Sequence, residues 1–221
     1  MTQTITRLFD NYSDAQNAVQ KLEALGVPHS DLSVLANNAD GAHGEHHHGH
    51  DHDHDGVNDH GDVSRGTSTG AVLGGAGGLL AGLGLLAIPG LGPIVAAGWL
   101  AATAAGAGLG ALGGAATGTI VGALKEAGHS DEEAHVYSEG VRRGGTLLSA
   151  RVPDELATQA EAVLHSHKSV DAATRGAAYR SQGWTSFDEN APAYDRDQVV
   201  AERTRYVGAG SEMVPRTGSS F

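Results

Sequence analysis

The chain contains no cysteine, few aromatic residues and few basic residues. The absence of cysteine among its 221 residues excludes disulfides and thiolate chemistry, and is typical of a reducing compartment. Aromatic residues make up 5% of the chain, so we expect a core of aliphatic and alanine side chains. Lysine and arginine together number 14 against 26 acidic residues, which gives a net charge of -12. The sequence shows no basic stripe that could neutralise phosphates, so the composition argues against a general nucleic-acid binder.

The sequence also lacks the patterns of an exported protein and of an enzyme. Residues 1–10 contain no apolar run of the kind that forms a secretory signal peptide, so we expect the globular part in the cytoplasm. There is no nucleophile elbow and no spaced pair of carboxylates in a plausible cleft. The glycines of residues 70–75 are not followed by the Lys-Ser/Thr of a phosphate-binding loop. We therefore expect a protein that is not an enzyme, and the sequence identifies no small-molecule substrate.

Glycine, in contrast, is abundant, with 33 residues, and it is regularly spaced. Residues 66–124 contain no charged residue and no histidine, and glycine recurs there at intervals of four. In a helix this spacing lines up small residues along one ridge, which lets a second helix approach closely. Because glycine costs about 1 kcal/mol in a helix interior relative to alanine, the regular spacing favours a packing role. The predicted helix-packing residues are Gly70, Gly74, Gly78, Gly82, Gly98, Gly106, Gly110, Gly114, Gly118 and Gly122.

This glycine zipper predicts a helical hairpin with arms at residues 70–88 and 94–124 and a turn at 89–93. The first arm would be roughly 28 Å long, close to the thickness of a bilayer core. The second would be roughly 46 Å long, which is too long for a simple crossing of the bilayer. A break near residues 106–108, which would give three helices, is therefore an alternative. We expect the hairpin to enter the cytoplasmic membrane, with lipid and further copies of the chain as partners. The alternative is a soluble hairpin that packs against the sheet or a neighbouring subunit.

A histidine-rich segment at residues 37–65 precedes the zipper. It has almost no large apolar side chains, so we expect it to be disordered. Neutral imidazoles at short spacing, interleaved with aspartates, suit Zn, Ni or Cu, although no fixed geometry would hold the ion. The alternative is a solvated linker that binds metal incidentally. The candidate metal ligands are His43, His46, His47, His48, His50, His52, His54 and His60.

Globular patterns flank these two segments and predict an α+β domain. We expect strands at residues 4–9, 31–36, 146–152 and 169–174. Helices are predicted from Ser13 to Gly26, from Ser130 to Arg142, and after Pro153, with Ser130 and Glu133 forming a capping box. The order of these elements suggests a ferredoxin-like antiparallel sheet with helices on one face, split by the zipper.

The domain organisation follows from these patterns. Residues 1–36 would form the first half of the α+β domain and residues 125–175 the second half. Between them lie the histidine-rich linker at 37–65 and the zipper hairpin at 66–124. Residues 176–221 are rich in Gly, Ser, Pro and mixed charges, so we expect a disordered tail with one short charged helix around 196–206.

Several stretches resemble a known family. The opening TITRLFDNYSDAQNAVQKLEALGVPHSDLSVLA, the zipper segment LLAIPGLGPIVAAG and the segment SEGVRRGGTLLSARV are similar to the bacterial general stress proteins with a heat-induced (YflT-like) domain. The similarity covers residues 4–174. It implies a stress-associated protein, often membrane-associated, and supplies no catalytic residues. The histidine-rich segment departs from the family's short acidic linker, so the resemblance implies nothing about metals.

Two functional hypotheses follow from the sequence. The first is a stress-associated, membrane-associated protein that self-associates through its zipper. The second is a soluble metal-binding or buffering module that uses the histidine-rich segment.

Arg142 and Arg143, next to a Gly-Gly pair, can bind an anion or a lipid headgroup, although a solvated helix end is the more usual role of such a pair.

Overall fold

A five-stranded antiparallel sheet forms the centre of the protein in a computed structural model that describes residues 1–41, 84–103 and 120–209. The strands are β1 (Thr2–Phe9), β2 (Leu32–Asn37), β3 (Gly84–Ile88), β4 (Gly92–Gly98) and β5 (Thr146–Pro153), in the spatial order β1-β5-β2-β4-β3. β5 lies between β1 and β2 and is antiparallel to both. The predicted α+β class is therefore confirmed, and the predicted strands at 4–9, 31–36 and 146–152 are present.

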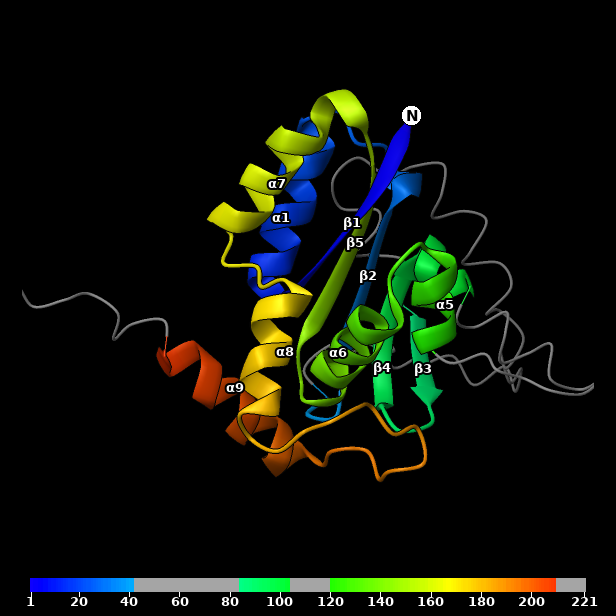
Figure 1. Cartoon of the computed structure of the whole chain (residues 1–221). Helices are drawn as coiled ribbons and strands as arrows, with labels where there is room; N and C mark the ends of the chain where they lie inside the picture. Colours follow the sequence, from blue (N-terminus) through cyan, green and yellow to red (C-terminus); the bar gives the residue numbers. More distant parts are fainter. Residues whose placement is uncertain (42–83, 104–119, 210–221) are drawn as a thin grey trace, which may run out of the picture.

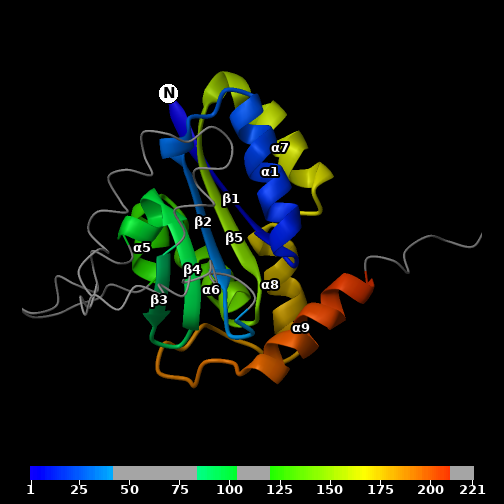
Figure 2. The ribbon, with the colours of Figure 1, turned by 180° about the vertical axis from the view of Figure 1, so that it is seen from behind.

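Helices cover both faces of the sheet (Figures 1 and 2). On one face α1 (Tyr12–Ala24) and α7 (Ala157–Ser166) pack together over β1, β5 and β2. On the other face α6 (Asp131–Arg142) crosses the same strands, and α5 (Ile120–Glu126) and α8 (Ala172–Arg180) pack beside it. Side chains alternate along each strand, so Ile5 and Leu8 of β1 enter different hydrophobic clusters. The expectation of helices on one face only is therefore wrong.

Local sequence signals explain several helix ends. Ser130 caps α6 by accepting a hydrogen bond from the Glu133 backbone N–H, and the Glu133 carboxylate accepts one from the Ser130 backbone N–H, so the predicted capping box is confirmed. The predicted start of α1 at Ser13 is replaced by a start at Tyr12, with Asn11 as the N-cap. Gly26 follows this helix at φ +98, a conformation that glycine adopts without strain.

The predicted helical hairpin is wrong over residues 84–98. These residues form β3 and β4, joined by a turn in which Gly90 and Gly92 have positive φ angles. β4 pairs with β2 and β3 pairs with β4, so this hairpin extends the main sheet. The rest of the first predicted arm, residues 70–83, lies outside the described residues. In the second arm, the helical pieces within the described part are residues 99–103 and α5. Among the described residues, no helix has the length and apolar character needed to span a membrane.

The predicted last strand at 169–174 is also wrong, because only Val170 bridges Leu8 on the outer side of β1. Asp171 ends this short contact by capping α8, accepting a hydrogen bond of 2.7 Å from the Thr174 backbone N–H.

Two short 3-10 turns precede other elements. η1 (His29–Asp31) leads into β2, and η3 (Asp154–Leu156) leads into α7.

The expectation of a disordered tail after residue 175 is wrong for the described residues up to 209. Beyond α8, residues 181–195 run beneath the β3–β4 turn and lead into α9 (Arg196–Ala209), shown at the lower end of the molecule in Figure 1. The expected charged helix around 196–206 is thus present. Phe187 and Tyr179 from this region are buried in the core.

Candidate functional site

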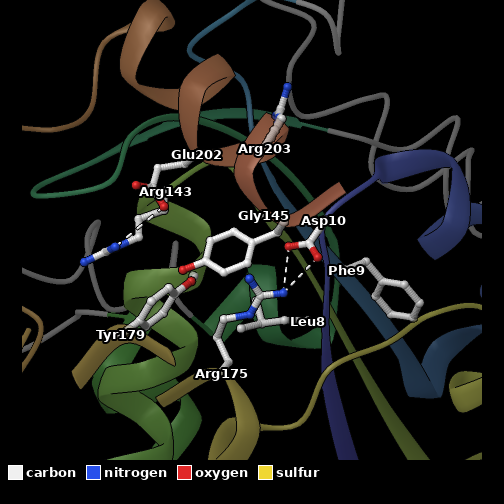
Figure 3. A pocket seen from close by; sticks show the side chains of 11 residues that line it. Leu8, Phe9, Asp10, Arg143, Gly145, Arg175, Tyr179, Glu202 and Arg203 are labelled. Atoms are coloured by element: carbon white, nitrogen blue, oxygen red, sulfur yellow. Dashed lines mark hydrogen bonds and ion pairs between the residues drawn. The ribbon is translucent and has the colours of Figure 1, made fainter. Parts of the chain in front are cut away.

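A cluster of buried charges lies where α9 rests on the body. We call it the α9 pocket, and Figure 3 shows its side chains. It is formed by the end of β1, the end of α6, α8 and α9, and the cavity at its centre measures about 10 Å³, room for about one water molecule. Its lining residues are Leu8, Phe9, Asp10, Gly140, Arg143, Gly145, Arg175, Tyr179, Glu202, Arg203 and Tyr206.

Each arginine of the α9 pocket has a carboxylate partner. Arg175, which is 3% exposed, donates to both oxygens of Asp10 at 2.7 and 2.9 Å. Arg143 donates from Nε to the fully buried Glu139 at 2.6 Å. Glu139 also pairs with Arg142 across one helical turn. Buried charges are tolerated when they are paired in this way.

Residues of α9 add further polar and apolar contacts to the α9 pocket. Glu202 approaches Arg143, with 3.6 Å between Oε2 and Nη1. Arg203 donates from Nε to the Gly144 carbonyl at 2.7 Å and also pairs with Asp40. Val199 is fully buried, and its side chain packs on Gly144, where a Cβ atom would meet it at 2.6 Å.

Aromatic rings line the arginines of the pocket. The Arg143 guanidinium lies 4.3 Å from the Tyr179 ring centroid, and the Arg175 guanidinium lies 4.0 Å from that of Tyr206. Such cation–π contacts stabilise a guanidinium that has lost part of its hydration. Burial raises the pKa of the Tyr179 hydroxyl, so this ring stays neutral. The pocket fixes α9 through charge and has no room for a substrate.

A second polar cluster connects the start of α6 to the sheet. His129 Nε2 lies 2.7 Å from Thr6 Oγ1, which lies 2.9 Å from Ser149 Oγ. Glu133 Oε2 is 3.9 Å from His129 Nδ1. The order of hydroxyl, imidazole and carboxylate is that of a nucleophile with its base. Thr6, however, is 1% exposed in the middle of β1, so a substrate cannot reach it.

Tyr137 closes the same cluster from α6. Its hydroxyl donates to the Thr6 carbonyl at 2.8 Å, and burial raises the pKa of this hydroxyl to about 12. The His129 ring meets the Tyr137 ring edge to face, with centroids 5.4 Å apart. The cluster therefore holds α6 on the sheet.

A wider, open depression of about 590 Å³ lies beside α6. Its lining includes His135, Asp188 and Glu189. Within the described part of the chain, no three His, Cys, Asp or Glu side chains are grouped closely enough to hold a metal ion.

Most of the predicted site residues lie outside the described ranges. This applies to all eight histidines, His43, His46, His47, His48, His50, His52, His54 and His60. It applies equally to Gly70, Gly74, Gly78, Gly82, Gly106, Gly110, Gly114 and Gly118.

The two remaining glycines have different surroundings. Gly98 ends β4 at φ +89, and a Cβ atom there would lie 2.2 Å from the Leu32 carbonyl oxygen. Its role is close approach between strands, so the prediction that it packs helices is wrong. Gly122 lies in α5 and is half-buried.

Most of the α9 pocket was not predicted from the sequence. Arg142 and Arg143 were predicted to form an anion site or a solvated helix end, but each side chain is only about one-tenth exposed and is paired with Glu139. The spacing of Glu139 to these arginines, three and four residues, was the available signal. Asp10, Arg175, Glu202 and Arg203 come from distant parts of the chain, and no local pattern connects them.

No family model, no curated protein and no solved structure matches the chain.

Proposed function

We propose that this protein is a non-enzymatic, stress-associated protein of the heat-induced (YflT-like) type that self-associates through its glycine-rich segments. The observation that supports the proposal is the position of the described residues from which these segments start. Residues 66–83 lead into β3, and residues 104–119 connect the helical residues 99–103 to α5.

These attachment points lie close together at one end of the sheet. Gly84, the first residue of β3, is directly opposite Ala96 in β4, and β4 ends two residues later. Leu100 and Ala101 are buried in the same cluster as Ile120 and Leu124 of α5. The described residues that flank the two glycine series therefore lie near one another, as a zipper between the series, or between copies of the chain, requires.

The strand order supports a ferredoxin-like body around this insert. β5 lies between β1 and β2, and Val170 bridges the outer side of β1. In a ferredoxin-like sheet, two split βαβ units combine in this strand order. Here the single bridge at Val170 stands where the last strand of that sheet would lie. On this proposal the β3–β4 hairpin and the glycine-rich segments form one insert between the two halves.

The cytoplasmic membrane remains our proposed location, with lipid as a partner of the glycine-rich segments, since residues 66–83 are uncharged and contain several leucines. Flotation of the full-length protein with vesicles of mixed zwitterionic and anionic lipids tests this part. Recovery of the protein with the vesicles supports it, and protein that stays at the bottom of the gradient contradicts it.

The self-association is tested by substitution on the glycine ridge. We expect Gly74→Leu combined with Gly78→Leu to lower the mass of the full-length protein in light scattering, because two isobutyl groups would block close helix approach. Ala76→Leu, off the ridge, is the matched control and should leave the mass unchanged. A full-length protein that is monomeric at all concentrations contradicts self-association, and an oligomer that tolerates the double substitution contradicts the zipper.

A further inference from the structure

We propose that β3 pairs with β3 of a second copy, antiparallel across a two-fold axis, so that the two sheets join. This inference rests on the proposed self-association and names a surface for it within the described residues. β3 is an edge strand, and in the described ranges no strand pairs with its outer side. The opposite edge of the sheet differs, because Val170 bridges β1 there.

Within the described ranges, the backbone N–H and C=O groups of β3 that pair with no other strand lie at its outer edge. The Pro93 carbonyl accepts a hydrogen bond from the Asn38 N–H, on the β2 side of β4. Ala87 is directly opposite Pro93, so its own N–H and C=O point away from β4. Leu85, two residues earlier, has the same orientation because of the two-residue repeat of a strand. Edge strands with such free groups are templates for pairing with another chain.

The side chains of β3 are those of an interface. Leu85 is 66% exposed, one of the most exposed large apolar residues that the structure describes. β3 has the sequence GLLAI, with no charge, proline or bulge of the kind that protects an exposed edge from pairing.

Charge favours a second copy of the chain as the occupant. The net charge of -12 makes two copies repel each other over most of their surfaces. Residues 84–103 contain no charged side chain, so two copies can meet at β3 without bringing like charges together. A strand that meets its own copy about a two-fold axis makes each contact twice.

One register uses all five residues of β3. With Leu86 opposite Leu86 of the second copy, Leu85 faces Ala87 of that copy, and the outward N–H and C=O groups of these residues pair. Leu86 then forms a non-hydrogen-bonded pair with its own equivalent, in which Cα atoms are typically about 4.5 Å apart.

Two variants of the full-length protein test the surface. Ala87→Pro removes an outward N–H and keeps the β3–β4 hydrogen bonds, and Leu85→Lys places a charge at the contact. We expect each to lower the mass in sedimentation velocity at least twofold, with an unchanged circular dichroism spectrum. Val200→Lys is the matched control, because Val200 is exposed on α9, 47% by area, and should leave the mass unchanged.

The register is tested by cross-linking, which the absence of cysteine makes possible. Leu86→Cys should form an intermolecular disulfide on mild oxidation, because the Cα separation fits one. Leu85→Cys is more exposed but would face Ala87, so it should cross-link at least several-fold less.

The outcomes separate this inference from the proposed function. If the protein is an oligomer but tolerates Ala87→Pro and Leu85→Lys, the β3 contact is wrong and the zipper remains. If these variants lower thermal stability without changing the mass, the chain's own residues cover β3 and the inference is again wrong. If the protein is always monomeric, the proposed function fails as well.

Discussion

At the residue scale, His129 shows how a single side chain connects two parts of the fold. It lies between α5 and α6, and its hydrogen bond to Thr6 reaches the centre of the sheet. Burial lowers the pKa of the imidazole; the nearby Glu133 carboxylate opposes this shift and Arg7 adds to it. The neutral ring is therefore the form that the folded protein holds.

This pKa shift predicts lower stability in mild acid. A histidine whose pKa is lower in the folded state binds protons preferentially when the chain unfolds, so stability falls as the pH drops below about 6.5, the usual value. We expect the urea midpoint of the protein to decrease between pH 7.5 and pH 5.5. His129→Gln, which keeps a polar partner for Thr6, should decrease less over the same range.

Two carboxylates near the sheet, Glu133 and Asp171, lose their stabilising contribution at lower pH than His129. Backbone hydrogen bonds lower the pKa values of Glu133 and Asp171, so the stability that these groups contribute is lost only below about pH 4.5. An equal decrease in both proteins between pH 7.5 and pH 5.5 would show that His129 is not the responsible group.

Gly98 illustrates how one residue type can have different roles. The four-residue spacing assigned it to a helix ridge, but its positive φ and its contact with the Leu32 carbonyl belong to a strand end. In both settings glycine is needed because a backbone comes close, so spacing alone could not distinguish them.

At the element scale, α9 is attached differently from the other helices. Val199 is its fully buried apolar residue, and its remaining described contacts with the body are ion pairs, hydrogen bonds and the Tyr206 ring. Helices that bury little apolar surface open locally at low free-energy cost. We therefore expect α9 to exchange its amide hydrogens faster than α6.

Val199 tests this attachment. Val199→Ala should destabilise the docked helix by about 2 kcal/mol through lost burial and a residual cavity. In hydrogen exchange, residues 196–206 should then exchange faster, and β5 should keep its protection. Val200→Ala, one residue later and exposed, is the control and should change neither. Faster exchange across the whole sheet in Val199→Ala would mean that α9 unfolds together with the body.

The β3–β4 hairpin shows where an element could be misassigned. Leucine, alanine and glycine are compatible with a helix, and the four-residue period favoured one. The signals for strands were the β-branched Ile88, Ile94 and Val95 and the two glycines of the turn. β4 pairs with β2 in the register of Asn37 with Ile94 and Ser33 with Gly98, across 57 to 65 positions of the chain. This is a tertiary contact that the local sequence pattern does not contain.

At the scale of the whole molecule, the histidine-rich segment is still a candidate metal site outside the described residues. Its eight imidazoles and interleaved aspartates predict loose, multi-site binding of Zn, Ni or Cu. We expect calorimetric titration of the full-length protein with Zn²⁺ or Ni²⁺ to show several weak sites. A variant lacking residues 42–62 should lose them, since these residues contain all eight candidate ligands.

Retained binding in that variant would place the metal elsewhere and contradict the prediction. The circular dichroism spectrum and thermal midpoint of the variant serve as the control. They should match those of the full-length protein, because the deleted residues lie between Gly41 and Gly84, outside the elements that form the described body.

Local sequence patterns were enough to predict the α+β class, three strands of the central sheet, the capped start of α6 and the charged C-terminal helix. These features depend on short-range alternation, helical spacing and caps, which a chain carries locally. Contacts between distant residues settled that residues 84–98 extend the sheet, that residues after 175 fold onto it, and that ion pairs from four distant segments meet in one pocket. Those outcomes depend on contacts between residues far apart in the chain, where burial and pairing override local preference.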